Sequence, residues 1–224
     1  NTAYHLYAAQ SKNTTKKNND KTMMGQYIEQ FEELAKDLKA ISPVLVADAY
    51  FSKFEYTHSV VSQGMEFISR LRVDANLRYL YNGSQKSGRG RKKKFAGKVN
   101  TKKIDKRRVK QMYEDEEIRV YSLIVNSVNL KRNILLVCVE YLNSLGNVTN
   151  MSMYFSTNLE RDAMQVVRYY KARFQMEFNF RDAKQFTGLT NCQARAEEKL
   201  HFHFNATLTA VNIGKGIVRK GIDK

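Results

Sequence analysis

The sequence predicts a mixed α/β fold, because helix-like and strand-like segments alternate along its first part. Apolar residues recur at helical spacing over residues 23–41, and Pro43 ends that helix. The next run, residues 44–47, is continuously apolar, as in a strand that is buried on both faces. A short helix over residues 52–63 and a strand over residues 67–71 then repeat the alternation.

The same patterns predict the remaining elements. Residues 3–9 suit a strand, and the polar run 11–22 suits a loop. Beyond Tyr81, a linker rich in Gly, Lys and Arg leads into a β-rich block. The later elements are strands at 118–128, 133–142 and 150–156, and helices at 158–186 and 195–218 that are separated by a turn near Gly188.

Length and composition set limits on the function. A chain of 224 residues can bury one substantial core and forms two domains at most. No segment reaches the roughly 18 uninterrupted apolar residues of a membrane span, and the N-terminus lacks the layout of a signal peptide, so we expect a cytoplasmic protein. The phosphate-binding motif G-x4-G-K-[S/T] is absent from the sequence, so we expect no nucleotide cofactor.

The positive charge is concentrated in one stretch of the chain. The net charge is +16, and the stretch from Lys86 to Lys110 holds thirteen basic residues and one acid, a net +12. Such a cluster favours an anionic partner through electrostatic attraction and counterion release. We interpret it as an arm that follows DNA phosphates; the alternative is a solvated loop.

A carboxylate surrounded by cations marks the helix predicted over residues 158–186. At about 100° per residue, one face of this helix carries a phenol, a carboxylate and three cations. These residues are Tyr170, Arg173, Glu177, Arg181 and Lys184. The alternative is a solvated face with ion pairs between residues four apart.

The spacing of these residues resembles the Y-x2-R-x3-E-x6-K signature of a large group of insertion-sequence transposases of the three-carboxylate, or DDE, class. Tyr170, Arg173, Glu177 and Lys184 match it without a gap. The segment Val46-Ala47-Asp48-Ala49-Tyr50-Phe51 is similar to the family's strand that ends in its second catalytic aspartate.

This resemblance implies a ribonuclease-H-like core with a β-rich insertion between the second aspartate and the glutamate helix. We therefore expect three segments: 1–78 as the first part of the core, 79–156 as the basic linker and insertion, and 157–224 as the C-terminal helices of the core. The family's first aspartate lies upstream of the region that Asn1 matches, so the core is expected to be incomplete, without its first strand or strands.

The resemblance also implies a two-metal site for Mg²⁺ or Mn²⁺, with Asp48 and Glu177 as catalytic ligands. Carboxylates suit this role, since two divalent ions activate the attacking oxygen and stabilise the leaving one in phosphoryl transfer. The partner would be double-stranded DNA, both the terminal repeats of the element and its target, bound by a homodimer on paired ends near the bacterial nucleoid. The expected DNA contacts are Tyr170, Arg173, Arg181, Lys184, Arg91, Lys92, Lys93, Lys94 and Lys98.

Two readings of the activity remain open at this point. One is a fragment of a transposase that retains the second Asp and the Glu, and that binds DNA but does not cleave it alone. The other is a catalytically inactive remnant that acts only as a DNA-binding protein. Asp74 is a candidate for the missing carboxylate, with a surface or DNA-facing role as the alternative, and Glu114–Glu117 is interpreted as a solvated acidic turn.

Overall fold

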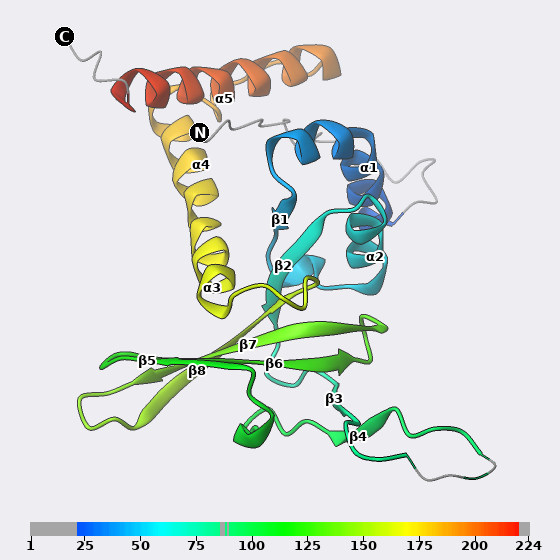
Figure 1. Ribbon diagram of the computed structural model, residues 1–224. Coiled ribbons are helices and arrows are strands. Elements are labelled where there is room, and N and C mark those ends of the chain that lie inside the picture. Colours follow the sequence, from blue (N-terminus) through cyan, green and yellow to red (C-terminus); the bar gives the residue numbers. More distant parts are fainter. Residues whose placement is uncertain (1–21, 86–87, 89, 220–224) are drawn as a thin grey trace. The chain divides into compact units, whose positions relative to one another are not determined.

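The computed structural model describes residues 22–85, 88 and 90–219 (Figure 1). The described residues fall into two compact units, residues 22–172 and residues 173–219, which we call the sheet unit and the helical unit. Each unit is considered by itself. The predicted strand at residues 3–9 lies outside the described residues.

The sheet unit is built on an eight-stranded sheet with the order β1-β2-β8-β7-β6-β3-β4, in which β5 also pairs with β6. Only β1 and β2 pair in parallel, and the other described pairs are antiparallel. The strands are β1 (Val44–Val46), β2 (Glu66–Leu71), β3 (Leu77–Leu80), β4 (Phe95–Lys98), β5 (Gln111–Glu114), β6 (Ile118–Ser127), β7 (Arg132–Leu142) and β8 (Val148–Ser156).

Helices cover both faces of this sheet (Figure 1). On one face, α1 (Met23–Ile41) and α2 (Phe54–Ser62) pack over side chains such as Phe67, Leu136 and Phe155. On the other face, α3 (Ala163–Ala172) packs over Ile68, Leu135 and Tyr154. Because successive side chains of a strand point to opposite faces, neighbouring residues of one strand enter different cores. The chain therefore buries apolar residues on both sides of its central strands.

Most predicted elements are confirmed in the sheet unit, and so is the mixed α/β class. The helix at 23–41 has the predicted bounds, with Thr22 Oγ1 accepting the Gly25 N–H at its start. The strands β6, β7 and β8 match the β-rich block. The helix predicted at 52–63 is shorter: a 3₁₀ turn, η1 (Ala49–Phe51), comes before α2. Strands β3, β4 and β5 are not predicted, because they are only four residues long and carry polar or charged side chains.

The single helix predicted over 158–186 is wrong. Residues 157–162 form a loop, α3 ends at Ala172, and α4 (Phe174–Phe186) follows. The hydrogen-bond ladder changes at the junction, since the Met176 N–H donates to the Arg173 carbonyl three residues back. The division into two compact units falls at the same place.

In the helical unit, α4 packs against α5 (Glu197–Arg219) through Ala183, Leu189, Leu208 and Val211. An ion pair between Asp182 and Lys215, 2.9 Å long, adds a polar tie between the two helices. Among the described residues, no helix is long and apolar enough to cross a membrane.

Candidate active site and nucleic-acid interface

Asp48 lies just beyond the carboxyl end of β1 and is exposed. Its Oδ1 accepts the Tyr50 N–H at 2.8 Å and so caps η1, while its backbone carbonyl accepts the Ser69 hydroxyl of β2 at 2.8 Å. The Ser52 hydroxyl in turn donates to Ser69 Oγ and the Arg70 carbonyl. These bonds fix the main chain around Asp48, and within the described residues no hydrogen bond or ion pair engages its second carboxylate oxygen.

Glu177 lies in the first turn of α4 and is exposed. Its Oε1 accepts from the Arg173 guanidinium at 2.9 Å, an i,i+4 ion pair. Arg181 and Lys184 follow four and seven residues later, so they share this face of α4 and are exposed as well. The helix therefore presents one carboxylate together with three cations, as its sequence predicts.

Tyr170 is buried in the sheet unit, with only 7% of its surface exposed. Its ring packs at a tilt against Tyr154 of β8, with the ring centroids 4.6 Å apart. The residue thus anchors α3 to the sheet two residues before the chain leaves the unit. Its predicted contact with DNA stays a prediction.

The two candidate metal ligands belong to different units, Asp48 to the sheet unit and Glu177 to the helical unit. A metal site that both carboxylates share is therefore a prediction. Each carboxylate is exposed, and each has one oxygen oriented by a donor. Asp and Glu oxygens are the donors that Mg²⁺ prefers, so the residue types fit a divalent cation. Within the described ranges, no group of three or more His, Cys, Asp or Glu side chains is assembled for a metal.

Asp74, the candidate for a third carboxylate, lies in the turn between β2 and β3. Both of its oxygens accept from the Arg72 guanidinium, at 3.1 and 3.2 Å, and both side chains are exposed. This pairing favours the alternative of a surface role beside the sheet.

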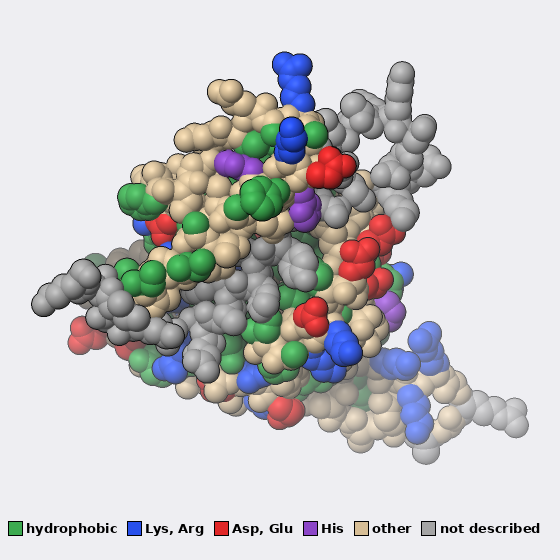
Figure 2. All heavy atoms as spheres, turned by 90° about the horizontal axis from the view of Figure 1, so that it is seen from above, with side chains coloured by type: hydrophobic (Ala, Val, Ile, Leu, Met, Phe, Trp, Pro, Cys, Tyr) green, Lys and Arg blue, Asp and Glu red, His purple; other side chains and the backbone are tan. Residues whose placement is uncertain are grey.

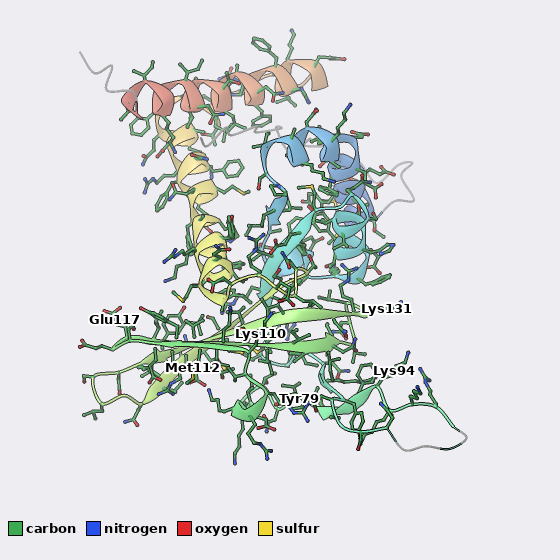
Figure 3. All side chains as sticks on the ribbon, viewed as in Figure 1. Tyr79, Lys94, Lys110, Met112, Glu117 and Lys131 are labelled. Atoms are coloured by element: carbon green, nitrogen blue, oxygen red, sulfur yellow. The ribbon has the colours of Figure 1, made fainter. Side chains whose placement is uncertain are left out.

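The basic stretch extends through β4 and a second 3₁₀ turn, η2 (Lys106–Arg108). Arg91, Lys92, Lys93 and Lys94 lead into β4 and are exposed, and Lys98 ends it. Gln85 bonds to both the N–H and the carbonyl of Lys93, which holds the two arms of this hairpin together. Figure 3 shows Lys94 on the arm that leads into β4, and in Figure 2 Lys and Arg side chains gather at that end of the sheet unit.

The start of η2 is tied to the sheet. Tyr79 of β3, labelled in Figure 3, accepts the Asp105 N–H at 2.9 Å through its hydroxyl, and the Arg108 guanidinium lies over its ring. Arg107 donates to the Asp105 carboxylate and holds its pKa below the usual value. The η2 end of the basic stretch is thus held on the sheet by specific contacts.

The acidic run Glu114–Glu117 forms the turn between β5 and β6. Asp115 Oδ1 accepts the N–H groups of Glu117 and Ile118 at 2.9 and 2.8 Å, and these two bonds lower its pKa. Glu114 pairs with Arg119 at 2.6 Å. The interpretation as an acidic turn is confirmed.

Sequence patterns did not single out Arg70 of β2. In the parallel pairing of β1 with β2, Val46 lies opposite Ile68. Asp48 and Arg70 each come two residues after these partners, toward the carboxyl ends of the two strands. The sequence does show a basic residue within the predicted strand Phe67–Leu71. It does not show that this strand pairs in parallel with β1, which is what brings Arg70 level with Asp48.

A mixed α/β sheet with an exposed aspartate at a strand end, and a separate helix that carries a glutamate among cations, define a candidate nucleic-acid-processing enzyme. A family model described as a transposase DDE domain matches residues 1–213, so the chain belongs to the DDE transposase family of insertion sequences. Proteins of this family are polynucleotidyl transferases and nucleases that typically use divalent metal ions, and DNA is their partner. A comparison with curated proteins finds no match.

Proposed function

We propose that this transposase cuts and joins DNA ends in the transposition of an insertion sequence, with Asp48 and Glu177 as ligands of catalytic Mg²⁺. The observation that carries the proposal is the cationic face of α4, on which Glu177 lies among Arg173, Arg181 and Lys184. Its spacing follows the family signature, and the family match spans this helix.

Asp48 and Glu177 would hold the metal through carboxylate oxygens. Divalent ions in such a site supply activation of the attacking oxygen and stabilisation of the leaving oxygen in phosphoryl transfer. The Tyr50 N–H orients the Asp48 carboxylate, and Arg173 orients that of Glu177. Because each donor occupies one oxygen, the remaining lone pairs are available for a cation.

The cations position DNA in this proposal. Arg181 and Lys184 would contact phosphates close to Glu177, while Arg91 to Lys94 and Lys98 would contact other phosphates of the duplex. Phosphate contacts of this kind fix the register of a protein on DNA without reading its sequence. In the same proposal, the sheet of residues 22–172 is a ribonuclease-H-like core joined to a β-rich insertion, and two copies of the chain act on paired ends.

Metal binding tests this function directly. Mn²⁺ bound by the full chain in the presence of a short DNA duplex is measured by electron paramagnetic resonance. We expect Asp48→Asn and Glu177→Gln each to weaken Mn²⁺ binding by more than about tenfold, since even outer-shell partners of metal ligands typically contribute that much. The matched controls are Asp37→Asn on α1 and Glu198→Gln on α5, which remove exposed carboxylates elsewhere in the two units. Unchanged affinity in both site variants contradicts the proposal.

A further inference from the structure

The strands β1 and β2 lie side by side (Figure 1), and hydrogen bonds continue beyond their last register pair. The Ala47 N–H donates to the Ile68 carbonyl at 3.2 Å, and the Ser69 hydroxyl donates to the Asp48 carbonyl at 2.8 Å. Neighbouring strands lie about 4.8 Å apart. The main chains of Asp48 and Arg70 are therefore held next to each other.

Asp48 and Arg70 direct their side chains to the face of the sheet that α3 covers. Successive side chains of a strand alternate between the two faces. Ile68 packs in the core beneath α3 and Leu71 packs in the core beneath α1 and α2, so Arg70 points to the α3 side. On β1, Val46 packs against the core beneath α3, and the main chain at Asp48 is still extended. Asp48 therefore lies on the same side as Arg70.

Arg70 has Asp48 on one side and Tyr154 of β8 on the other. The antiparallel register of β2 with β8 pairs Arg70 with Tyr154, whose ring packs against Tyr170 of α3. Burial raises the pKa of the Tyr154 phenol, and the positive charge of Arg70 opposes this shift, as a nearby cation does. The row therefore leads across the sheet from the candidate metal ligand to Tyr170, the first residue of the family signature.

The guanidinium of Arg70 is available to a ligand. It is exposed, and within residues 22–85, 88 and 90–219 it forms no ion pair and no hydrogen bond. Other arginines near β2 are engaged, since Arg72 pairs with Asp74, and Arg161 pairs with Glu66 at the start of the strand. An exposed cation without a partner in this part of the chain thus stands beside the candidate catalytic aspartate.

The chemistry of this pair of residues favours a phosphate group. A divalent cation bound by Asp48 and the guanidinium of Arg70 would repel each other unless an anion lay between them. A phosphate meets this requirement, because one of its oxygens can bind the metal while others accept the planar fork of the guanidinium. The proposed partner of the chain, DNA, carries such a group at every nucleotide.

We propose that Arg70 binds the non-bridging oxygens of the DNA phosphate that is cleaved at the metal held by Asp48. Negative charge is spread over these oxygens during phosphoryl transfer, so a guanidinium that is already in place stabilises the transition state. The inference rests on the proposed function. It gives a role in that reaction to a residue that the sequence patterns did not single out.

DNA binding in the presence of Mn²⁺ tests the contact. The affinity of the full chain for a short duplex is measured for the wild type, Arg70→Ala and Arg70→Lys. We expect Arg70→Ala to lower the affinity by about tenfold or more, because hydrogen bonds between charged groups are strong. Arg70→Lys keeps the charge but loses the fork, so it should lose most of the same affinity.

The matched control is Lys36→Ala, which removes an exposed cation from α1 on the opposite face of the sheet and should keep the wild-type affinity. Wild-type affinity in Arg70→Ala overturns the inference. Wild-type affinity in Arg70→Lys contradicts a contact through the fork. Circular dichroism of each variant checks that the fold is retained, as expected for an exposed side chain.

Electron-nuclear double resonance of the same complexes reports on the phosphate itself. The phosphorus nucleus of a phosphate bound to Mn²⁺ couples to the metal, and a purely structural role of Arg70 would leave this coupling unchanged. We expect the coupling to be weakened or lost in Arg70→Ala while Mn²⁺ stays bound. If it persists there, the role of Arg70 is rejected and the proposed function stands. If the wild-type chain with DNA binds no Mn²⁺, both are rejected.

Discussion

Glu140 of β7 has three polar groups directed at its carboxylate, although its side chain is only 13% exposed. Its Oε1 accepts the Tyr121 hydroxyl at 2.8 Å and Lys106 Nζ at 3.3 Å, and its Oε2 accepts from Arg119 at 3.1 Å. Burial raises the pKa of Glu140, but the bonds from Tyr121 and Arg119 and the charge of Lys106 outweigh it, so the pKa is lowered. Glu140 thereby holds η2 and the end of the basic stretch on the sheet.

We expect Glu140→Ala to lower the free energy of unfolding by about 1–3 kcal/mol, because it removes the acceptor of the Tyr121 hydroxyl and one of the two carboxylates that Arg119 pairs with. Urea denaturation followed by circular dichroism measures the change. Glu117→Ala removes an exposed carboxylate from the same sheet and should change stability by no more than about 0.5 kcal/mol. Equal effects of the two variants would mean that Glu140 has no structural role.

At the scale of single residues, the sequence shows which side chains could bind a metal or DNA better than it shows what surrounds those side chains. Asp48 and Glu177 stand out because a strand end and a spaced signature mark them. The same signature predicts that Tyr170 contacts DNA, but it cannot show that the Tyr170 ring packs against Tyr154, since the two residues meet only after α3 packs on β8.

The pairing of α4 with α5 depends on a charged contact beside an apolar one. Lys215 donates to the Asp182 carboxylate, and this bond, together with the positive charges of Lys215 and Arg181, lowers the pKa of Asp182 below its ordinary value of 3.8. A lowered pKa in the folded state means that the contact stabilises the fold above the unfolded pKa. That contribution is lost as the pH falls through the lower, folded value.

We therefore expect carboxyl NMR titration to give Asp182 a pKa below 3.8 in the wild-type chain and a value closer to 3.8 in Lys215→Met. The acid side of the stability curve should also flatten in Lys215→Met, because less stability then depends on the ionised carboxylate. The same Asp182 pKa in both chains would show that the ion pair does not form in solution.

Elements with strong periodicity could be predicted, and short or interrupted ones could not. The helix α1 and the strands β6, β7 and β8 have long apolar patterns that decide their structure locally. Strand β5 lacks such a pattern and forms because β6 offers a free edge. The break at Arg173 depends on a change in hydrogen bonding that helical spacing does not reveal.

At the scale of the whole molecule, the sequence predicts a sheet with helices, and the structure adds that both sheet faces carry a core. The order of strands could not be predicted, because the pairing of β2 with β8 joins segments far apart in the chain. The same holds for the candidate catalytic residues. Local patterns identify Asp48 and Glu177 one at a time, and only the family's plan implies that they meet.

The central claim is that Asp48 and Glu177 are ligands of the same metal site. Iron-mediated cleavage of the protein backbone tests this claim most directly. Fe²⁺ replaces Mg²⁺ in the full chain bound to DNA, and peroxide with ascorbate then generates radicals that cut the backbone near the metal. We predict cuts beside both Asp48 and Glu177 in the wild-type chain. The single substitution Glu177→Ala should abolish the cuts at both places. Cuts beside Asp48 that persist in Glu177→Ala would contradict a shared site.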